Sequence, residues 1–365
     1  MLNNKIVAVV VPTYNEEKQI GIVIETMPDF VDRIVIVNDF SKDNTVGVVK
    51  KYLKSNDKSK LKIVHHTPEI EPTGYNVAEI TLQELNKKEI NYFTPFKIVN
   101  TDPEHDKIIL INHLKNGGVG AAIATGYKWC KDHKIDCAAV MAGDGQMDPS
   151  ELGHICRPIL EDGVDYVKGN RLIHRSAWLV IPKIRYFGNS FLSVLTKIAS
   201  GYWHVSDSQT GYTAISLKAL NAIRIHKIYK RYGIPNDMLV KLNIAFCTLK
   251  EVEIKPVYNV GEQSKMKFFK VIPKISWLLV KSFFKRLWVK YLFRDFHPLF
   301  LFYNFALILF TLTIPYFIKI LEYLLFGRSL ADATLIAFIF LFIAGFQSLV
   351  FAMWMDIQDN ERLYK

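Results

Sequence analysis

The chain has 365 residues, half of them hydrophobic, and a formal net charge of +11. About 260 N-terminal residues have an ordinary mixture of polar and apolar types, which fits one large α/β domain or two smaller ones. Four cysteines without paired metal-ligand spacing argue against a cysteine metal centre and fit reduced thiols in a cytosolic domain.

Strands and helices are predicted to alternate along these N-terminal residues. We expect strands at 5–11, 33–37, 61–65, 107–111, 137–141 and 165–168. Between them we expect helices at 16–27, 45–53, 77–88, 120–133 and 150–161. The βαβ alternation predicts a largely parallel sheet that is covered on both faces. A polar stretch at about 66–106 interrupts it. The residues before the first strand show no signal-peptide pattern, so we expect none.

The predicted strand at 137–141 runs directly into an acidic turn at 144–149. In an open α/β sheet, ligands bind at the carboxyl ends of the strands. A hard divalent cation takes oxygen ligands, and one or two carboxylates together with diphosphate oxygens form a typical magnesium or manganese site. The turn therefore suggests a metal and nucleotide-diphosphate site. The alternative is an ordinary strand-end turn, in which Asp, Gly and Pro are common.

The first two predicted strands also end in polar residues, at 12–16 and at 38–43. A carboxylate there can accept hydrogen bonds from a base or a ribose, and Tyr14 can pack against a base. Helix capping is the alternative for Asn15 and Asp43, and it is the favoured interpretation of those two residues. The glycines at 117, 118 and 120 lack the spacing of a dinucleotide-binding turn, which argues against a Rossmann dehydrogenase.

Two apolar runs at 298–321 and 331–355 are each long enough to span a bilayer, which takes about 20 residues. A buried core helix is the alternative for either run alone, but two in succession predict a transmembrane hairpin. Residues 266–296 carry eight Lys or Arg against one Asp, with hydrophobic residues on the other helix faces. This pattern favours a segment in the anionic headgroup region over a nucleic-acid-binding surface. The positive-inside rule then places the N-terminal domain and the tail 356–365 in the cytoplasm.

Several motifs, in this order, resemble family 2 glycosyltransferases. The resemblance extends to the membrane-anchored polyprenyl-phosphate branch, which includes dolichyl-phosphate mannose synthase and bacterial undecaprenyl-phosphate glucosyltransferases. The matching segments are 11–16, 38–45, 116–126, 142–149, 168–171, 206–212 and 261–265. The resemblance covers roughly residues 5–265 apart from 66–106, and the ordered set is far more specific than any single motif.

The resemblance implies a GT-A fold, which is α/β and Rossmann-like with a mainly parallel sheet. It implies a glycosyltransferase domain at 1–260, a juxtamembrane segment at 261–297, a transmembrane hairpin at 298–355 and a tail at 356–365. The donor-binding residues implied are Pro12, Tyr14, Glu16, Asp39, Gly120, Asp144 and Gln146. Of these, Asp144 and Gln146 would hold a divalent cation, Mg²⁺ or Mn²⁺.

One departure affects the metal motif. Family members often have Asp-x-Asp before the glutamine, whereas this chain has Ala142 at the first acidic position. Asp148 lies too far along the turn to be assumed a replacement. The departure puts the identity and the affinity of the metal site in doubt.

The acceptor side is expected to bind a phosphate. A lipid phosphate is already anionic near pH 7, so it needs placing rather than deprotonation, and arginine donates two parallel hydrogen bonds to phosphate. Arg171, Arg185 and Lys265 are the candidates, although a solvated surface charge is the alternative for any lone cation. Asp207 matches a recurrent family aspartate that orients the sugar or the metal shell, and Asp237 is a weaker candidate for the sugar pocket.

The predicted reaction is inverting transfer of a sugar from a nucleotide-diphosphate sugar to a polyprenyl phosphate at the cytoplasmic membrane face. The partners implied are the donor, the lipid acceptor and the bilayer, with no nucleic acid; a homo-oligomer is left open. One alternative is a processive polysaccharide synthase, which would bring more spans and a Gln-x-x-Arg-Trp signature. Another is a catalytically silent membrane scaffold, which Ala142 favours. A transporter fits poorly, because the spans carry no intramembrane charge.

Overall fold

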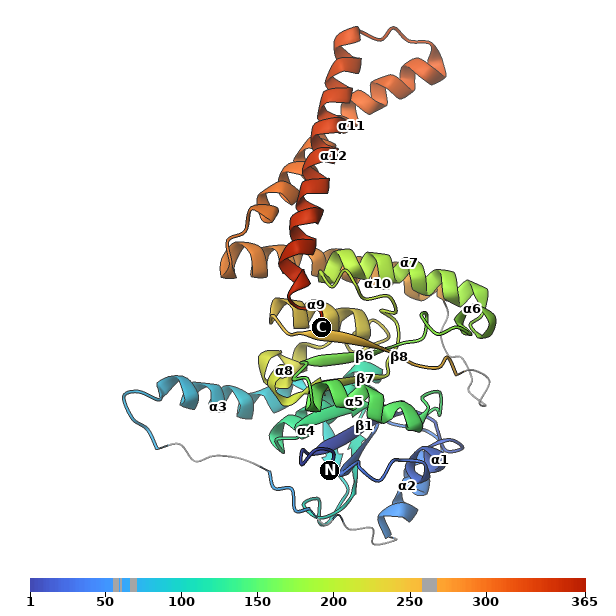
Figure 1. Cartoon of the computed structure of the whole chain (residues 1–365), viewed down its shortest axis with the longest axis vertical. Helices are drawn as coiled ribbons and strands as arrows, with labels where there is room; N and C mark the ends of the chain where they lie inside the picture. Colours follow the sequence, from blue (N-terminus) through green and yellow to red (C-terminus); the bar gives the residue numbers. More distant parts are fainter. Residues whose placement is uncertain (55–58, 60, 66–70, 258–267) are drawn as a thin grey trace.

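The N-terminal body of the protein, residues 1–257, is a three-layer α/β structure (Figure 1). The computed structural model describes residues 1–54, 59, 61–65, 71–257 and 268–365, with the side chains of 54, 184, 185 and 268–271 left out. Eight strands form one sheet in the order β3-β4-β2-β1-β5-β7-β6-β8. The strands are β1 (Val7–Thr13), β2 (Arg33–Asn38), β3 (Phe96–Ile98), β4 (Ile108–His113), β5 (Cys137–Val140), β6 (Tyr166–Asn170), β7 (Thr213–Ser216) and β8 (Leu249–Glu253).

The sheet is mainly parallel, as predicted. Only β3 and β7 run antiparallel to their neighbours. Every residue of β1 and β2 is buried, because these central strands are covered by helices on both faces and are rich in valine and isoleucine. One face is covered by α4 (Val119–Asp132), α8 (Leu217–Ala222) and α9 (Ile234–Ile244). The other is covered by α1 (Ile20–Glu25), α2 (Thr45–Lys54) and α5 (Leu152–Leu160).

The predicted strand at 61–65 is wrong. The position beside β4 is occupied by β3, and the backbone at 61–65 pairs with none of the described strands. Instead it makes single contacts, such as the 3.0 Å hydrogen bond from the Ile63 N–H to the Glu104 carbonyl. The other predicted strands are confirmed. The helix expected at 16–27 begins only at Ile20, and β3 was not expected within the polar stretch.

Two long helices lie side by side on the body, at the end from which the hairpin projects (Figure 1). They are α7 (Lys183–Ser200) and α10 (Phe268–Trp288), and a short helix, α6 (Ala177–Val180), precedes α7. Ile275 and Leu279 of α10 are buried against Leu192 of α7 and Val240 of α9. One apolar face of the predicted headgroup segment therefore packs on protein. Its opposite face stays open, with the Trp277 side chain 72% exposed.

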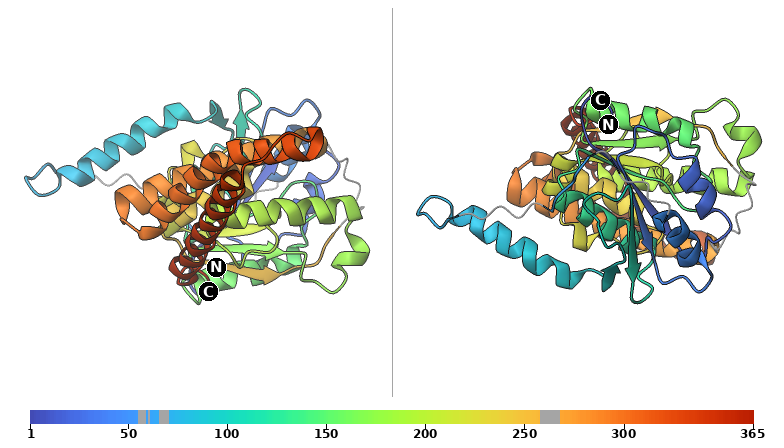
Figure 2. Two further views of the ribbon diagram at one scale, coloured as in Figure 1. Left: turned by 90° about the horizontal axis from the view of Figure 1, so that it is seen from above. Right: turned by 90° about the horizontal axis from the view of Figure 1, so that it is seen from below.

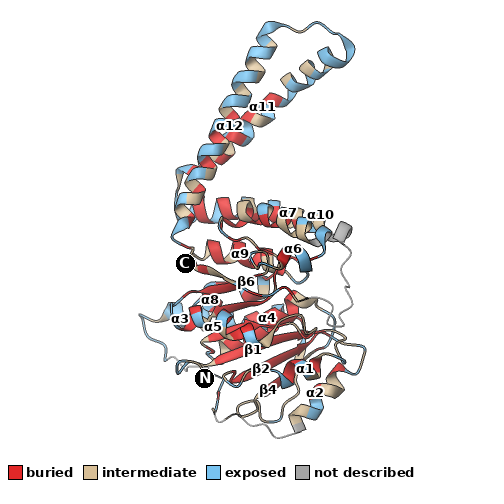
Figure 3. Cartoon of the chain, turned by 45° about the vertical axis from the view of Figure 1, so that its right-hand side comes forward, coloured by how far each residue is buried: buried red, intermediate tan, exposed pale blue. Residues whose placement is uncertain are grey.

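The last two helices form an extended antiparallel pair that leaves the body. They are α11 (Pro298–Phe326) and α12 (Asp332–Glu361), both long and apolar enough to cross a membrane. Most of their surface is exposed in the protein alone, since only 22% and 17% of their most apolar windows is buried (Figure 3). An apolar helix with an apolar exposed surface is not the core helix of a water-soluble protein. The pair fits two transmembrane spans.

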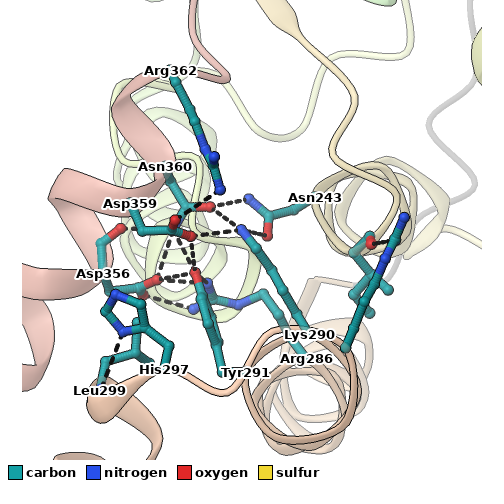
Figure 4. A network of polar contacts seen from close by, with 12 residues as sticks. Asn243, Arg286, Lys290, Tyr291, His297, Leu299, Asp356, Asp359, Asn360 and Arg362 are labelled. Carbon is teal, nitrogen blue, oxygen red and sulfur yellow. Dashed lines mark hydrogen bonds and ion pairs between the residues drawn. The ribbon is translucent and has the colours of Figure 1, made fainter.

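The base of the hairpin is tied to the body by a buried polar network, which we call the hairpin knot (Figure 4). Arg286 of α10 makes two 2.7 Å hydrogen bonds to the Asp356 carboxylate, and neither side chain is exposed. Tyr291 donates to Asp356 at 2.9 Å, and Lys290 donates to Asn360 at 2.6 Å. Arg286 and Lys290 were counted among the residues expected to face lipid headgroups, and this is wrong. Their buried acidic and amide partners on α12 hold them inside the protein.

The hairpin knot also explains why α12 extends to Glu361, beyond the predicted end of the span at 355. Asp356 and Asn360 lie one helical turn apart, so they face the same buried partners. The last residues then join the edge of the sheet. Leu249 of β8 donates to the Leu363 carbonyl at 2.7 Å and accepts from the Lys365 N–H at 2.9 Å. Both ends of the hairpin are thus fixed to the body.

We expect Asp356→Ala to destabilise the detergent-solubilised protein by about 3–5 kcal/mol, because it leaves the Arg286 guanidinium buried without its charge partner. Thermal unfolding followed by circular dichroism in one detergent would measure the change. The control is Glu322→Ala, which removes the exposed Arg328–Glu322 pair and should cost about 1 kcal/mol or less. Equal effects of the two substitutions would show that the knot does not hold the hairpin.

Candidate active site

The candidate active site is a cleft of about 830 Å³ at the carboxyl ends of the parallel strands. Its position follows from the topology, because the loops after β1, β2 and β5 meet at one edge of the sheet. Seven of the predicted site residues line it: Pro12, Tyr14, Glu16, Asp39, Asp144, Gln146 and Arg171. Gly120 and Asp207 are buried behind its wall.

The loops after β1 and β2 are joined to each other by side-chain contacts. The Asn15 side chain accepts a 2.7 Å hydrogen bond from the Lys42 N–H, and the Asn15 N–H donates to Ser41 Oγ at 3.0 Å. Capping of α1 by Asn15 is therefore wrong, since that helix starts only at Ile20. Asp43 accepts from the Thr45 N–H at the start of α2, as the capping interpretation predicts. Together these contacts fix the backbone of the loop after β1, which carries Tyr14 and Glu16.

Asp39 holds the glycine turn at the start of α4. Its two carboxylate oxygens accept hydrogen bonds of 2.7 Å from the Gly117 and Gly118 N–H groups, and Oδ1 lies 2.8 Å from His113 Nδ1. Burial alone would raise the pKa of Asp39, but these three partners outweigh it and hold the pKa below its ordinary value. The side chain was expected to contact base and ribose. With 3% of Asp39 exposed, its main structural task is to shape the turn beside the cleft.

Residues 228–233, which we call the cleft loop, pass across the start of α4. The Lys230 carbonyl accepts a 3.0 Å hydrogen bond from the Gly120 N–H. Gly118 has a φ of +91°, and a Cβ there would collide with the same carbonyl, so glycine is needed for this approach. Gly120 was predicted to bind the donor. In the structure it faces the backbone of the cleft loop.

The cleft loop brings two side chains into the cleft, those of Arg231 and Tyr232. Its path is fixed by Asp237, which accepts a 2.7 Å hydrogen bond from the Tyr229 N–H and forms an ion pair with Lys241. Asp237 is therefore engaged in holding the loop. Arg231 and Tyr232 were not predicted from the sequence, because they lie in a loop without a recognisable motif and far along the chain from the glycine turn that they approach.

The loop after β5 carries the predicted metal ligands. Asp144 Oδ1 accepts from the Gln146 N–H at 3.1 Å, and both residues line the cleft beside Ala142. Asp148 also lines it, but its carboxylate accepts from the Ser150 N–H at 2.9 Å and lies 3.6 Å from Lys255 Nζ. No group of three or more His, Cys, Asp or Glu side chains that could hold a metal occurs among the residues described. Protein groups alone therefore do not form a cation cage here.

Arg171 follows β6 and is held by Asp207. Its Nε and Nη2 donate to the two Asp207 oxygens at 2.8 and 3.1 Å. The Asp207 side chain is 0% exposed, while 22% of the Arg171 side chain is exposed. Burial would raise the pKa of Asp207, but the charge and hydrogen bonds of Arg171 hold it below its ordinary value. Asp207 was expected to orient the sugar or the metal shell. In the structure both of its carboxylate oxygens accept hydrogen bonds from the Arg171 guanidinium.

A second buried layer supports this pair. Glu251 of β8 accepts from the Ser206 and Asp207 N–H groups at 2.9 and 3.2 Å. Lys168 of β6 is fully buried and donates to the Thr210 carbonyl at 2.5 Å. Burial lowers the pKa of Lys168 to about 8, although the charges of Asp207 and Glu251 act in the opposite direction. The motif at 168–171 thus places one cation in the core and one beside the cleft.

The remaining predicted cations are less defined. The Arg185 backbone belongs to α7, but its side chain lies outside the description, and Lys265 lies outside the described residues altogether. Further polar side chains that were not predicted from the sequence line the cleft, namely Asn189, Gln209 and Lys255. They come from elements in the second half of the body that had no predicted helix or strand.

One wall of the cleft is apolar. It is formed by side chains of α7, α9 and α10, namely Leu192, Ile234, Ile272 and Ile275. These helices lie at the hairpin end of the body (Figure 1). The same cavity therefore combines carboxylates, cations and glycine-turn backbone with a hydrocarbon-lined wall.

The known proteins that this chain is similar to include glycosyltransferases. The sequence profile described as "Glycosyl transferase family 2" matches residues 8–69 and 96–224. A UDP-N-acetylglucosamine–dolichyl-phosphate N-acetylglucosaminyltransferase of Methanococcus voltae is 31% identical, over 70% of this chain and 87% of that protein. A dolichyl-phosphate beta-glucosyltransferase of Trichomonas vaginalis is 23% identical, over 77% of this chain and 74% of that protein.

Among solved structures, glucosyl-3-phosphoglycerate synthase from Mycobacterium tuberculosis in complex with UDP matches 78% of this chain and 80% of its own. The TM-score is 0.46 and the identity is 15%. The family profile covers more than half of the chain, and together with the mainly parallel sheet it confirms the predicted GT-A fold. The chain belongs to glycosyl transferase family 2 and is a glycosyltransferase.

Proposed function

We propose that this enzyme transfers one sugar from a nucleotide-diphosphate sugar to a polyprenyl phosphate, with inversion at the anomeric carbon. The observation that carries the proposal is the composition of the cleft. Polar loops after β1, β2 and β5 line it together with an apolar wall from the helices at the hairpin end of the body. A donor that is polar and an acceptor that is a lipid phosphate need such a mixed cavity.

The donor that we propose is a uridine-diphosphate sugar. The Methanococcus voltae relative carries UDP-N-acetylglucosamine in its name, and it is the most similar relative reported above. Tyr14 provides a ring for a base, and Glu16 provides an acceptor for base or ribose hydrogens; both line the cleft. Arg231 adds a cation suited to diphosphate oxygens.

The oxygen ligands that Asp144 and Gln146 offer fit a divalent cation that is also bound by the substrate diphosphate. Mg²⁺ is usually held by one or two carboxylates together with substrate phosphates rather than by a protein cage. Asp144 and Gln146 provide one carboxylate and one amide oxygen at the cleft, which suits that arrangement, with Ala142 providing no second carboxylate. When bound, the cation would neutralise charge that develops on the leaving diphosphate.

The chemistry asks for placement rather than for a strong base. A phosphate oxygen of the lipid, already anionic, attacks the anomeric carbon from the side opposite the nucleotide. The bond from that carbon to the diphosphate oxygen breaks, and its electron pair leaves with the nucleoside diphosphate. No proton needs to be removed from the nucleophile. Arg171, fixed by Asp207, is the residue that we assign to the acceptor phosphate, because an oriented guanidinium binds phosphate with two hydrogen bonds.

The membrane side of the body is proposed to be the surface of α6, α7 and α10. Exposed apolar side chains gather on these helices, including Trp178, Leu179, Phe187, Phe191, Trp277 and Trp288. Lys274, Lys281 and Lys285 are also exposed on α10 and suit anionic headgroups. With this face on the bilayer and basic residues before α11, the body and both termini are cytoplasmic.

Transfer into a lipid product tests the proposed reaction. We expect the purified enzyme with polyprenyl phosphate and Mn²⁺ to convert one radiolabelled donor of a UDP- and GDP-sugar panel into a chloroform-soluble product. Asp144→Ala or removal of the metal with EDTA should lower the rate about a hundredfold or more, because charge on the leaving diphosphate is no longer neutralised. Added Mn²⁺ should restore the EDTA-treated enzyme but not the variant.

The matched control is Asp162→Ala, an exposed acid that pairs with Lys250 away from the metal loop and should leave the rate unchanged. Product size separates the alternatives. A product with one sugar per lipid supports the proposal, whereas a growing polymer would indicate a processive synthase. No transfer from any donor by a folded enzyme that binds nucleotide would refute the lipid acceptor.

Arg171→Lys should lower kcat/KM for polyprenyl phosphate at least about tenfold, because lysine keeps the charge but loses the two-pronged geometry. Asp207→Asn should have a similar effect, since the guanidinium loses the carboxylate that orients it. Steady-state kinetics with each substrate varied would check this. The affinity for UDP should stay close to that of the wild type, and a loss of UDP affinity instead would place Arg171 on the donor.

The orientation can be tested with single introduced cysteines, because all four native cysteines are buried. A membrane-impermeant maleimide should label Ser329→Cys, in the turn between α11 and α12, only from the outer face of the membrane. Glu79→Cys, on exposed α3 (Val77–Glu89), should be labelled only from the cytoplasmic face. Labelling of both positions from the same face would contradict the proposed topology.

A further inference from the structure

Residues 70–95 lie between the two stretches that match the family profile and fall outside both. They include α3 and a short helix, η1 (Ile90–Tyr92). Helix α3 projects from the body as an arm (Figures 1 and 2), and nearly all of its side chains are exposed or half-exposed. Glu89, its last residue, is the exception, because only 7% of it is exposed.

Glu89 is buried against a histidine from a distant part of the chain. Its Oε1 lies 2.6 Å from His226 Nδ1, and the two side chains are 8% and 17% exposed. Tyr92 of η1 places its ring 5.3 Å from the His226 ring, with the planes inclined by 30°. Lys131 of α4 approaches Glu89 Oε2 at 4.0 Å. Residues 70–95 therefore contact His226 with two side chains, the Glu89 carboxylate and the Tyr92 ring.

His226 belongs to η3 (Ile225–Lys227), which leads directly into the cleft loop at 228–233. That loop is fixed by Asp237 at Tyr229, its second residue, and by the hydrogen bond between Lys230 and Gly120 in its middle. Glu89 adds a third attachment at His226, two residues before the loop begins. All three attachments precede Arg231, which lines the cleft.

We propose that Glu89 is a positioning residue for the donor nucleotide, acting through His226 and the cleft loop on Arg231. An arginine with its backbone already fixed loses less entropy when it binds diphosphate oxygens than one on a loose loop. Residues 70–95 thereby raise donor affinity from outside the stretches that match the family profile. This inference rests on the proposed function, because it takes the cleft to be the donor site.

The loss of Glu89 would have different effects if its contact with His226 served only to stabilise the fold. If Glu89 only stabilised the fold, its loss would lower the melting temperature and reduce the affinity for both substrates alike. If it positions Arg231, its loss acts on the donor alone and depends on the presence of that arginine. The coupling between Glu89 and Arg231 is therefore the quantity to measure.

The experiment is titration calorimetry of the full-length, detergent-solubilised protein with UDP and Mn²⁺. We expect Glu89→Ala to weaken UDP binding about tenfold, within the usual range for coupling between two sites. Glu89→Gln, which keeps an acceptor for His226 but loses the charge, should weaken it less. The matched control is Glu84→Gln on the same helix, whose partner Lys88 is exposed, and it should leave UDP affinity unchanged.

A double-mutant cycle completes the test. On an Arg231→Ala background, Glu89→Ala should weaken UDP binding by less than about twofold, because the side chain that it positions has been removed. The KM for polyprenyl phosphate should not change in Glu89→Ala. Wild-type UDP affinity in folded Glu89→Ala, or additive losses in the cycle, would overturn the inference while leaving the proposed function intact. A wild-type enzyme that binds neither UDP nor GDP would overturn both.

Discussion

The arrangement of the whole molecule depends on one buried ion pair, between Arg286 and Asp356. Taking two charges out of water is costly, and the cost is offset only where the geometry is good and other partners satisfy the remaining groups. Here the guanidinium also donates to the Ala199 and Ile198 carbonyls at 3.0 Å. Its N–H groups therefore find acceptors on α7 as well as on α12. One side chain thus joins the helix beside the cleft, the body and the hairpin. Gly201, which follows α7 with a φ of +78°, has no Cβ. The Arg286 guanidinium can therefore approach the last turn of α7 closely.

The same logic explains how several acids in or near the cleft keep their charge inside the protein. Asp39 shapes the glycine turn, Asp207 orients Arg171, and Asp237 holds the cleft loop. Each is a buried carboxylate with several hydrogen-bond donors, which is the condition for keeping a charge inside a protein. Their fields and contacts fix the groups that line the cavity. Asp144, at the half-exposed turn after β5, is the carboxylate that we propose for the cation.

The sequence predicts the first half of the fold well, because β1, β2, β4 and β5 are β-branched or apolar runs that end in turn residues. It also predicts the hairpin, since there are two successive apolar runs and each is longer than the about 20 residues that span a bilayer. The second half of the body is harder, because α7 and α9 mix polar and apolar residues that line the cleft and pack against other helices at the same time. The partners of a charge were not predictable either. Arg286 and Lys290 look like surface cations in the sequence, and only the return of α12 to the body buries them.

Helix α10 links the two functions of the chain, chemistry and anchorage, within one rigid element. Ile272 and Ile275 near its start line the cleft, and Arg286 near its end holds the hairpin. Arg286 lies 14 positions after Ile272, which is about 21 Å along the helix, so the helix sets the separation between the cleft wall and the base of the hairpin. A flexible linker of the same length would let the body drift from the bilayer and would add the entropy of that motion to every encounter with a lipid. Helix α10 is instead packed on the body along one face and exposes Trp277 and Trp288 on the other, which suits the proposed position of the cleft beside the bilayer.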